Sequence, residues 1–414
     1  MMKILWVTAQ VLPLLSNDLN IKSYNTGGWV MSMLNLLKKI PEFKIGIAMV
    51  SSGVKDMFHK TLDGFECYVA PEHGKKGITN KNRDTIINKF DPDIIHIEGN
   101  EFPIHNSFTT TPRKTLLSIQ GILSGIEPYQ NGCIPLNDLM FTFNRNFIPS
   151  WFLHLKKKLS FNPRIKIENQ TIKASKFITG RTEWDKAHTY WLNPAAKYFK
   201  INRILRPIFY KSQWDMDAID RNTIFVGNGY SPLKGLHFVI EAAAKLKKEF
   251  PDIKFKIAGV NPLSHNSFFS LKKYGYGNYI KNLIRKYQVD KNLIFLGSLP
   301  AEEMVRQMRS SNIYLLPSLI ENSPNTLAEA MMLGMPCISA YTGGAPYMAD
   351  SEKEAVFYRP NDPDLLAWQI RRLLKTPSFA MEIGKNARER ALRTHNIEET
   401  LQSLIQVYKY IYIH

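Results

Sequence analysis

The sequence predicts an α/β protein made of two doubly wound domains, and three observations lead to that fold class. The chain has 414 residues, more than one ordinary hydrophobic core needs, so two domains of about 200 residues are expected. Its composition, 44% hydrophobic and 22% charged, is typical of a soluble globular protein. Short apolar runs alternate with helical patterns, and the alternation occurs in both halves of the chain.

The first 120 residues contain five apolar runs of strand length with helical periods between them. A strand–helix–strand order places neighbouring strands parallel and covers the sheet with helices. The expected strands are Lys3–Ala9, Lys44–Ser51, Cys67–Ala70, Ile94–Ile97 and Thr115–Ile119, and the expected helices include Trp29–Ile40 and Arg83–Phe90.

The second half repeats this order. The expected strands are Asn222–Val226, Ile253–Gly259, Leu293–Leu296, Ile313–Pro317 and Pro336–Ser339, and the expected helices are Leu236–Glu249, Asn278–Tyr287, Ala301–Ser310 and Thr326–Leu333. Ligands of doubly wound sheets bind at the carboxyl ends of the strands, so a cleft between the two domains is expected there.

Pro207 and a mixed polar stretch interrupt the pattern near residues 205–217, which sets the domains at 1–205 and 206–390. The remaining segment, 391–414, is expected to pack as a helix on the N-terminal domain. Its apolar residues recur at a helical period, at Leu401, Leu404, Ile405, Tyr408 and Ile411.

The net charge of +18 is concentrated in one part of the chain. Residues 145–203 hold 13 lysines and arginines against three acidic residues. Such a field attracts nucleic acid, anionic lipid or a phosphorylated substrate, and a solvated surface is the plain alternative. Within it, Trp151–Leu159 pairs apolar residues with a lysine cluster. This stretch fits an anionic membrane surface and an ordinary helix equally well.

The cysteines and the apolar runs exclude several classes of protein. Cys67, Cys133 and Cys337 are far apart and form no C-x-x-C pair, which argues against a disulfide framework and a cysteine zinc site and fits a reducing cytoplasm. The N-terminus is interpreted as a first strand, not a signal peptide, and no apolar run has the length of a membrane span.

Three segments of the second half carry candidate chemistry. In Phe225–Gly235 a strand ends in a glycine-containing turn followed by Lys234-Gly235, which suits a phosphate, although such turns are often structural. In Leu315–Met331 a buried strand leads into a helix that Asn322 or Ser323 can cap, with Pro324 in its first turn and an anion-binding N-terminus. Ser339–Pro346 places Gly343-Gly344 after another strand, where they could form a simple turn.

Two glutamates flank the second of these segments. Glu321 precedes the helix and Glu329 lies in its second turn among apolar neighbours. A phosphate repels a carboxylate, but the hydroxyl groups of a sugar donate hydrogen bonds to it. The spacing therefore favours contacts with sugar hydroxyls, and an exposed helical glutamate is the alternative for Glu329.

Taken together, these residues resemble the retaining family-4 glycosyltransferases of the GT-B architecture, in which two Rossmann-like domains face a central cleft. Glu321 and Glu329 match the E-x7-E motif of that family. Lys234-Gly235 matches its phosphate-binding Lys-Gly, and Gly343–Pro346 matches its late Gly-Gly-x-Pro loop. Gly27-Gly28 matches its N-terminal glycine loop. The match is strong over residues 220–350 and weak in the first half.

The resemblance implies a role for each matching residue. Glu329 would hold the ribose of the donor and Glu321 the transferred sugar, while Lys234 would neutralise the departing diphosphate. The other residues implied to bind the donor are Gly27, Gly28, Gly229, Asn322, Ser323, Asn325, Thr326, Gly343 and Gly344. The family needs no metal in the site and no cofactor besides the UDP- or GDP-sugar. No D-x-D pair is placed here to hold a divalent ion, which agrees with that expectation.

The sequence departs from the family pattern at three places. Gly229 occupies the position of an expected arginine, for which Arg181 and Arg206 are candidate substitutes. Pro324 removes one backbone donor from the donor loop, and Asn322 or Asn325 can compensate. Tyr347 stands where a glutamate is usual.

The N-terminal domain would bind the acceptor, and four residues are candidates on that side. Gln120-Gly121 stands where the family often has a histidine and a glycine. Glu98 is a candidate by its place at a strand end, and Arg181 by its charge. The nearby Glu101 is a further candidate for the cleft, besides these four, by its position alone. His96 is interpreted mainly as a hydrogen-bonded core residue.

The resulting hypothesis is a metal-independent glycosyltransferase of the hexosyltransferase type. It would act on a glycan or lipid-linked acceptor in surface polysaccharide or lipopolysaccharide synthesis. It would be cytoplasmic, with peripheral contact to the inner face of an anionic membrane. A nucleotide-sugar epimerase or another GT-B enzyme is the alternative. Nucleic-acid binding has only the charge in its favour, because no RNA-binding motif accompanies it.

Overall fold

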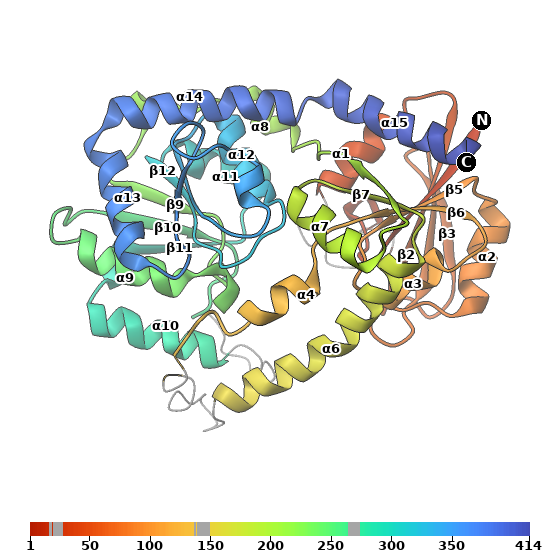
Figure 1. Cartoon of the computed structure of the whole chain (residues 1–414), viewed down its shortest axis with the longest axis horizontal. Coiled ribbons are helices and arrows are strands. Elements are labelled where there is room, and N and C mark those ends of the chain that lie inside the picture. The colour runs from red at the N-terminus through yellow and green to blue at the C-terminus, as the bar shows by residue number, and fades with distance from the viewer. Residues whose placement is uncertain (16–18, 20–27, 136–137, 139–149, 264–273) are drawn as a thin grey trace. The chain divides into compact units, whose positions relative to one another are not determined.

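The computed structural model describes residues 1–15, 19, 28–135, 138, 150–263 and 274–414 (Figure 1). The chain divides into two compact units. The first contains Met1–Gly125, Asn162–Ile204 and His395–His414, and the second contains Ile126–Phe161 and Leu205–Thr394. The terminal segment from His395 therefore groups with the first unit, and Ile126–Phe161, which the sequence assigns to the N-terminal domain, groups with the second.

The first unit is built on an eight-stranded sheet of order β3-β4-β2-β1-β5-β6-β7-β8. All neighbouring strands are parallel except β3 and β4, which form an antiparallel pair at the edge. The strands are β1 (Met2–Thr8), β2 (Phe43–Ser51), β3 (Phe58–Leu62), β4 (Phe65–Pro71), β5 (Ile94–Glu98), β6 (Lys114–Ser118), β7 (Phe177–Gly180) and β8 (Lys197–Lys200). The five strands expected in this half are confirmed, and β3, β7 and β8 are additional.

Helices cover both faces of this sheet, which explains why most residues of its central strands are apolar. They are α1 (Gly28–Leu37), α2 (Asn80–Phe90), α3 (Pro103–Thr109), α7 (Glu183–Leu192) and α15 (Ile397–Ile413), with the C-terminal part of α6 (Ser150–Ala174). The short helix α4 (Leu123–Ile126) lies at the end of the first segment of this unit. Tyr408 of α15 is fully buried and packs edge-on against Phe43 of β2. The apolar period of the last segment thus forms part of the core of the first unit.

The second unit has a six-stranded, wholly parallel sheet of order β11-β10-β9-β12-β13-β14. Its strands are β9 (Thr223–Val226), β10 (Lys254–Ala258), β11 (Leu293–Gly297), β12 (Ile313–Leu316), β13 (Cys337–Ala340) and β14 (Val356–Tyr358). Strands β9, β10 and β11 follow one another toward one edge of the sheet. The chain then returns, so that β12 lies on the other side of β9 and β13 and β14 continue toward the opposite edge. Each unit is thus a Rossmann-like domain, and the predicted fold class is confirmed for both.

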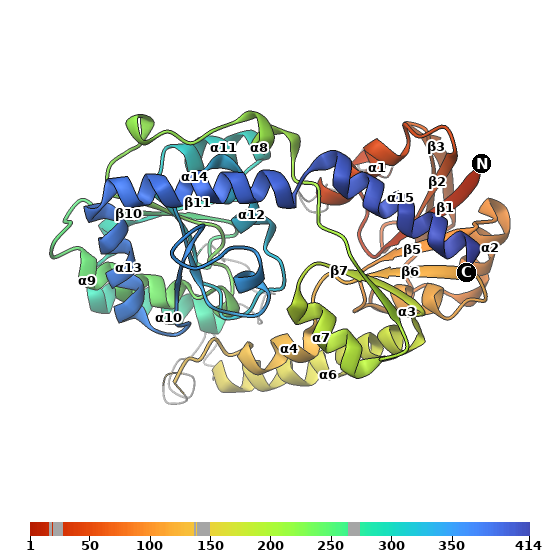
Figure 2. The ribbon, with the colours of Figure 1, turned by 45° about the horizontal axis from the view of Figure 1, so that its top comes forward.

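The helices of the second unit form a layer on each side of its sheet (Figure 2). One layer contains α9 (Leu236–Leu246), α10 (Tyr274–Tyr287) and α13 (Pro363–Lys375). The other contains α8 (Pro207–Lys211), α11 (Ala301–Arg309) and α12 (Asn325–Leu333), with the C-terminal part of α14 (Pro377–Thr394). The buried apolar residues of α12 pack against β12 and β13, and this packing fixes the position of the E-x7-E segment.

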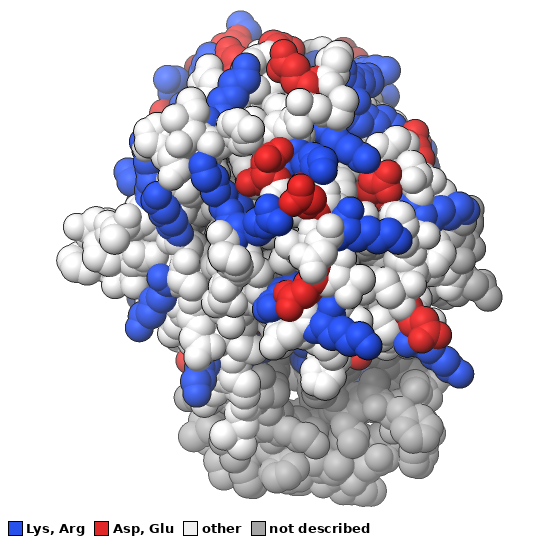
Figure 3. All heavy atoms as spheres, turned by 90° about the vertical axis from the view of Figure 1, so that its right-hand side faces the viewer, with Lys and Arg blue, Asp and Glu red and all other residues white. Residues whose placement is uncertain are grey.

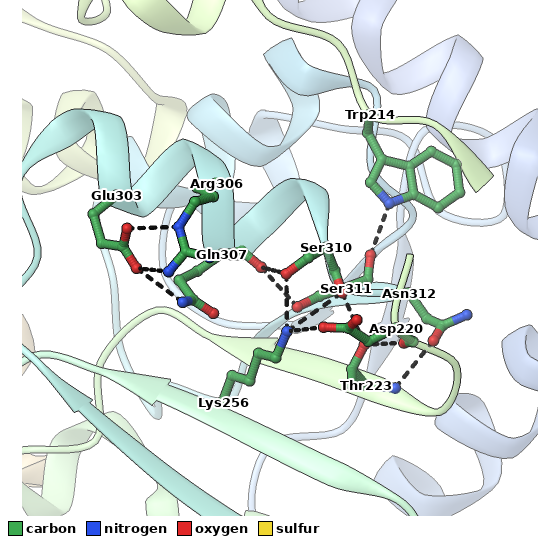
Figure 4. Close-up of polar contacts among 10 residues, drawn as sticks. All are labelled: Trp214, Asp220, Thr223, Lys256, Glu303, Arg306, Gln307, Ser310, Ser311 and Asn312. Atoms are coloured by element: carbon green, nitrogen blue, oxygen red, sulfur yellow. Dashed lines mark hydrogen bonds and ion pairs between the residues drawn. The ribbon is translucent and has the colours of Figure 1, made fainter. Parts of the chain in front are cut away.

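A polar network closes the opposite edge of this sheet, where the strands begin (Figure 4). The Lys256 ammonium, on a residue only 7% exposed, lies 2.7 Å from an Asp220 carboxylate oxygen and 2.9 Å from the Ser310 hydroxyl. The Asn312 side-chain oxygen accepts a hydrogen bond of 3.0 Å from the Thr223 backbone N–H. These contacts join the start of β9 to the end of α11, away from the carboxyl ends of the strands where ligands bind.

The surface carries basic side chains with acidic ones among them on the face shown in Figure 3. Among the described residues, Lys3 and Arg113 both lie within ion-pair distance of Asp91, and Lys44 pairs with Glu66. Among the described residues no helix is both long enough and apolar enough to span a membrane.

Candidate functional site

The second unit reverses its strand order between β9 and β12, and the loops that follow these two strands carry the candidate residues. The loop after β9 runs to Gly235, and the loop after β12 runs to Pro324. They are joined by a hydrogen bond of 2.8 Å from the Leu319 N–H to the Leu233 carbonyl. Two of the segments that the sequence singles out are therefore in direct contact.

The turn Lys234-Gly235 lies against the end of β12. Gly235 has a φ of +69°, and a Cβ there would lie 2.1 Å from the Pro317 carbonyl oxygen, so only glycine fits this position. The close approach brings the Lys234 ammonium within 2.5 Å of the Glu321 Oε1 atom. The structure thus joins into one ion pair the lysine expected to neutralise the diphosphate and the glutamate expected to hold the transferred sugar, the two residues for which the resemblance implies catalytic roles.

The glycine pair after β13 supports the same glutamate from the other side. The Gly344 N–H donates a hydrogen bond of 2.8 Å to the Glu321 carbonyl. A Cβ on Gly343, whose φ is +51°, would lie 2.1 Å from that same oxygen. Gly343-Gly344 therefore fixes the backbone of Glu321, which is more than a simple turn at a strand end would do.

The expectation that Asn322 or Ser323 caps helix α12 is wrong. Pro324 is the N-cap residue, and no side chain makes a capping hydrogen bond there. The helix begins at Asn325, one residue later than a cap at Ser323 requires, because the backbone of Pro324 is extended, with a ψ of 115°, and does not form part of the helix. The first-turn N–H groups of Asn325 and Thr326 thus stay uncapped by side chains, as an anion site at a helix N-terminus requires. The Thr326 hydroxyl accepts a hydrogen bond of 2.8 Å from Tyr314.

Glu329 is buried, at 3% exposed, and is not the exposed helical glutamate of the alternative interpretation. Arg206 binds it through two hydrogen bonds of 2.7 Å, one to each carboxylate oxygen. Burial raises the pKa of Glu329, and the Arg206 guanidinium opposes that shift. Arg206, a candidate substitute for the missing arginine, therefore lies at the second glutamate of the motif.

Gly229 leaves no space for a side chain. A Cβ at this position would lie 2.9 Å from Leu236 Cδ2 and 3.0 Å from Ile257 Cγ2, so it would point into the core of the unit. A cation on the donor site consequently has to come from another part of the chain.

The first unit brings all four acceptor-side candidates together. Glu98 Oε1 accepts hydrogen bonds from Gln120 and, at 3.3 Å, from the Trp29 indole N–H. Arg181 donates a hydrogen bond of 3.0 Å to the Gln120 carbonyl. His96 lies at the base of this group, with its Nε2 atom 3.7 Å from the second oxygen of Glu98.

His96 is a core residue, as its main interpretation had it. Its ring stacks on Trp6 at a centroid distance of 3.9 Å, and its Nδ1 atom lies 2.6 Å from the hydroxyl of Tyr408. Burial lowers its pKa to about 3, so the ring is neutral at physiological pH.

Sequence reasoning missed Arg203 and Trp29 in this group. The Arg203 guanidinium stacks over the Trp29 ring at 4.5 Å and donates a hydrogen bond of 2.5 Å to the Gln120 side-chain oxygen. Burial and the neighbouring Arg181 lower the pKa of Arg203. Two cavities border the group, of about 40 Å³ and about 110 Å³, and Trp29 and Glu98 line both. Arg203 follows β8, so recognition of that strand would have placed it at a strand end with the others.

Three further expectations concern the Gly27-Gly28 pair, the Trp151–Leu159 stretch and Glu101. Gly27 lies outside the described residues, and Gly28 opens α1. The Trp151–Leu159 stretch is helical in α6, but among its side chains only that of Leu159 is described, and it is 62% exposed. Glu101 pairs with Arg164, and burial raises its pKa.

The sequence of the second unit matches a known family. Residues 212–390 match the family described as glycosyl transferases group 1. The putative colanic acid biosynthesis glycosyltransferase WcaL of Escherichia coli (strain K12) is 28% identical over 184 residues. That alignment covers 42% of this chain and 42% of the relative, so the chain matches less than half the length of this protein.

Solved structures resemble the chain over its whole length. Sucrose-phosphate synthase from Thermosynechococcus elongatus superposes with a TM-score of 0.71 at 15% identity and full coverage of both chains. The Anabaena protein Alr3699/HepE, solved in complex with UDP-glucose, superposes with a TM-score of 0.68 at 14% identity, covering 99% of this chain and 100% of the other. The chain therefore has the GT-B fold, and residues 212–390 of its second unit are similar to the group 1 glycosyl transferases.

Proposed function

We propose that the chain is a retaining, metal-independent hexosyltransferase. It would move a sugar from a UDP- or GDP-sugar to a glycan or lipid-linked acceptor in surface polysaccharide or lipopolysaccharide synthesis. The observation that carries the proposal is the pairing of both motif glutamates with cations at the strand-order reversal of the second unit. Lys234 lies 2.5 Å from Glu321, and Arg206 lies 2.7 Å from Glu329.

Each group has a place in the proposed transfer. The C1–O bond to the diphosphate breaks and the acceptor oxygen bonds to C1, while the proton of the acceptor hydroxyl passes to the departing diphosphate, on which negative charge develops. Lys234 and the uncapped N–H groups of Asn325 and Thr326 stabilise that charge without a metal ion. Glu321 accepts hydrogen bonds from the transferred sugar, and Glu329 accepts them from the ribose. The donor residues Gly28, Asn322 and Ser323 complete this site, and Gly343-Gly344 holds Glu321 in place.

The acceptor is proposed to bind at the group formed by Glu98, Gln120 and Arg181 in the first unit. This group offers both hydrogen-bond donors and acceptors beside the Trp29 ring, a combination that suits a sugar with apolar faces and polar edges. Gln120 cannot titrate, and burial lowers the pKa of His96 to about 3, so His96 is a weak base and neither residue suits a proton-transfer step near neutral pH.

A thermal-shift panel of UDP- and GDP-sugars tests the donor, because a specific ligand raises the melting temperature by mass action. We expect one nucleotide sugar to stabilise the wild type, Glu329→Ala to abolish that effect, and Lys234→Ala to slow transfer. Glu249→Ala, a change of an exposed glutamate in the same unit, is the control.

Two further arms separate this function from its alternatives. Incubation of the donor without acceptor would yield an epimer if the chain were an epimerase. Transfer in the presence of EDTA tests metal independence. Normal turnover by both Glu329→Ala and Lys234→Ala would overturn the proposal.

A cytoplasmic location with peripheral membrane contact is also proposed, from the basic residues of the 145–203 region. Salt-sensitive co-sedimentation with anionic vesicles, but not with neutral ones, is the expected result. Equal recovery with both kinds of vesicle would refute it.

A further inference from the structure

The second motif glutamate is held by a residue that no part of the motif includes. The Arg206 Nε and Nη2 atoms each lie 2.7 Å from a different oxygen of Glu329. Arg206 is the second residue of the segment Leu205–Thr394 of the second unit and lies 123 positions before Glu329. Only the folded chain brings the two together.

We propose that Arg206 is a positioning residue for the donor nucleotide, which orients the Glu329 carboxylate so that it accepts the hydroxyl groups of the ribose. This inference rests on the proposed function and names a further residue of the same site. The family's usual arginine, at the position of Gly229, would contact the diphosphate itself. The role proposed for Arg206 is different, because Arg206 acts on the ribose through Glu329.

Arg206 is itself held in place. Its guanidinium lies over the Phe209 ring at 4.7 Å, and Phe209 is fully buried in the core cluster that contains Leu327 and Ala328 of α12. Pro207 begins helix α8 directly after Arg206 and fixes the backbone there. The fork of the guanidinium is therefore fixed relative to the helix that carries Glu329.

The geometry leaves Glu329 able to bind a ligand. A carboxylate has about four acceptor sites, and a two-pronged guanidinium takes one on each oxygen, which leaves about two for hydroxyl donors. A ribose offers two neighbouring hydroxyl groups. The Arg206 side chain is 27% exposed, whereas that of Glu329 is 4% exposed, so the pair is open on the arginine side.

Arg206 also favours the ionised form of the carboxylate. Burial by itself favours the protonated form of Glu329, and the arginine counteracts it. A protonated carboxyl has fewer acceptor sites and would bind a diol less well. The positive charge further offsets the repulsion between Glu329 and the diphosphate of the same ligand.

The two glutamates of the motif thus have matching arrangements. Lys234 holds Glu321 and Arg206 holds Glu329, and each cation comes from a loop outside the motif. A lysine provides one charged point, whereas an arginine provides a planar fork that sets the rotation of the carboxylate. The pair at Glu329 is accordingly the one suited to aligning a diol.

Calorimetry first shows which of UDP, GDP and ADP the wild type binds most tightly. The affinities of Arg206→Ala and Arg206→Lys for that diphosphate are then compared with the affinity of the wild type. Arg371→Ala is the matched control, because Arg371 also forms a two-pronged pair, with Glu249, in the same unit, at 2.6 and 3.1 Å. We expect Arg206→Ala to weaken binding on the order of 10- to 100-fold, the range of charge-assisted hydrogen bonds. Arg206→Lys should recover only part of this loss, and the control should bind as the wild type does.

The pH dependence separates positioning from plain structural support. Without Arg206 the pKa of Glu329 rises further, so on acidification binding to Arg206→Ala should weaken at a higher pH than binding to the wild type does. In a double-mutant cycle, Arg206→Ala should add little to the loss caused by Glu329→Gln, because it acts through that residue.

Three results would overturn the inference: unchanged affinity of Arg206→Ala, tighter binding by it, or additive losses in the cycle. Circular dichroism and melting temperature show whether each variant is folded, and Arg206→Lys replaces Arg206→Ala in the cycle if the latter is not. A wild type that binds none of the three diphosphates would refute the proposed function instead, and the inference with it.

Discussion

Substituting Gly343 by alanine tests how the glycine pair supports the site. Gly343 has a φ of +51°, and a Cβ at this position would lie 2.1 Å from the Glu321 carbonyl oxygen. No side chain rotation relieves this contact, because the opposing atom belongs to the backbone. Either the loop or the backbone of Glu321 has to move.

The expected cost has two parts that a matched variant separates. Gly297 also has a positive φ, +74°, but a Cβ there meets nothing within 4 Å. Gly297→Ala should therefore cost only the left-handed strain, about 1–2 kcal/mol. Gly343→Ala adds the loss of the hydrogen bond from the Gly344 N–H to Glu321, about 1 kcal/mol, for a total of about 2–3 kcal/mol.

Transfer should respond more strongly than stability. A displacement of about 1 Å at a reacting centre can lower the rate on the order of 100-fold. We therefore expect Gly343→Ala to lose most of its turnover of donor and acceptor, while Gly297→Ala keeps wild-type turnover. Urea unfolding gives the stabilities, and release of the nucleoside diphosphate gives the rates. Equal stability and equal turnover of the two variants would refute the idea that the glycine pair holds Glu321.

Three further predictions concern other parts of the chain. Gly229→Arg, which restores the family's usual residue, should not tighten donor binding in calorimetry and should destabilise the fold by about 1–3 kcal/mol, because its side chain starts toward the core. Lys256→Met should stay within about 1 kcal/mol of the wild type in urea unfolding, whereas Asp220→Ala should cost more, because it leaves a buried ammonium without its carboxylate (Figure 4). Burial raises the pKa of Glu168 to about 7 in the folded state, above its value of 4.5 in the unfolded chain, so the protonated form stabilises the fold at low pH. That contribution, roughly 3 kcal/mol, should disappear as the pH rises from about 4.5 to about 7, and Glu168→Gln should flatten the dependence in unfolding measured at several pH values.

Most buried strands were accessible from the sequence, although the short buried strands β7 and β14 were not expected. The expected strands of both halves are present, and the segment 391–414 contains helix α15, Ile397–Ile413. Strand β3 and strand β8 were missed because they lie at or near the edge of the sheet and are partly exposed, so their residues show no continuous apolar run.

The cap of α12 shows where local patterns mislead. Asn322 and Ser323 have suitable side chains for an N-cap, but the helix begins after Pro324. Capping preferences describe which residue is favoured at a helix start, whereas the start itself is set here by proline geometry and by the packing of α12 on its sheet.

The sequence by itself determined the two-domain α/β class and the motif residues Glu321, Glu329 and Lys234. Spacing along the chain and the change from strand to helix are local properties, and they identify strand ends. The tertiary structure decided which charges meet: Lys234 with Glu321, and Arg206 with Glu329. These contacts join residues 87 and 123 positions apart, and no local propensity encodes them. They exist because parallel strands carry distant loops to the same edge of a sheet, where a buried carboxylate requires a cation.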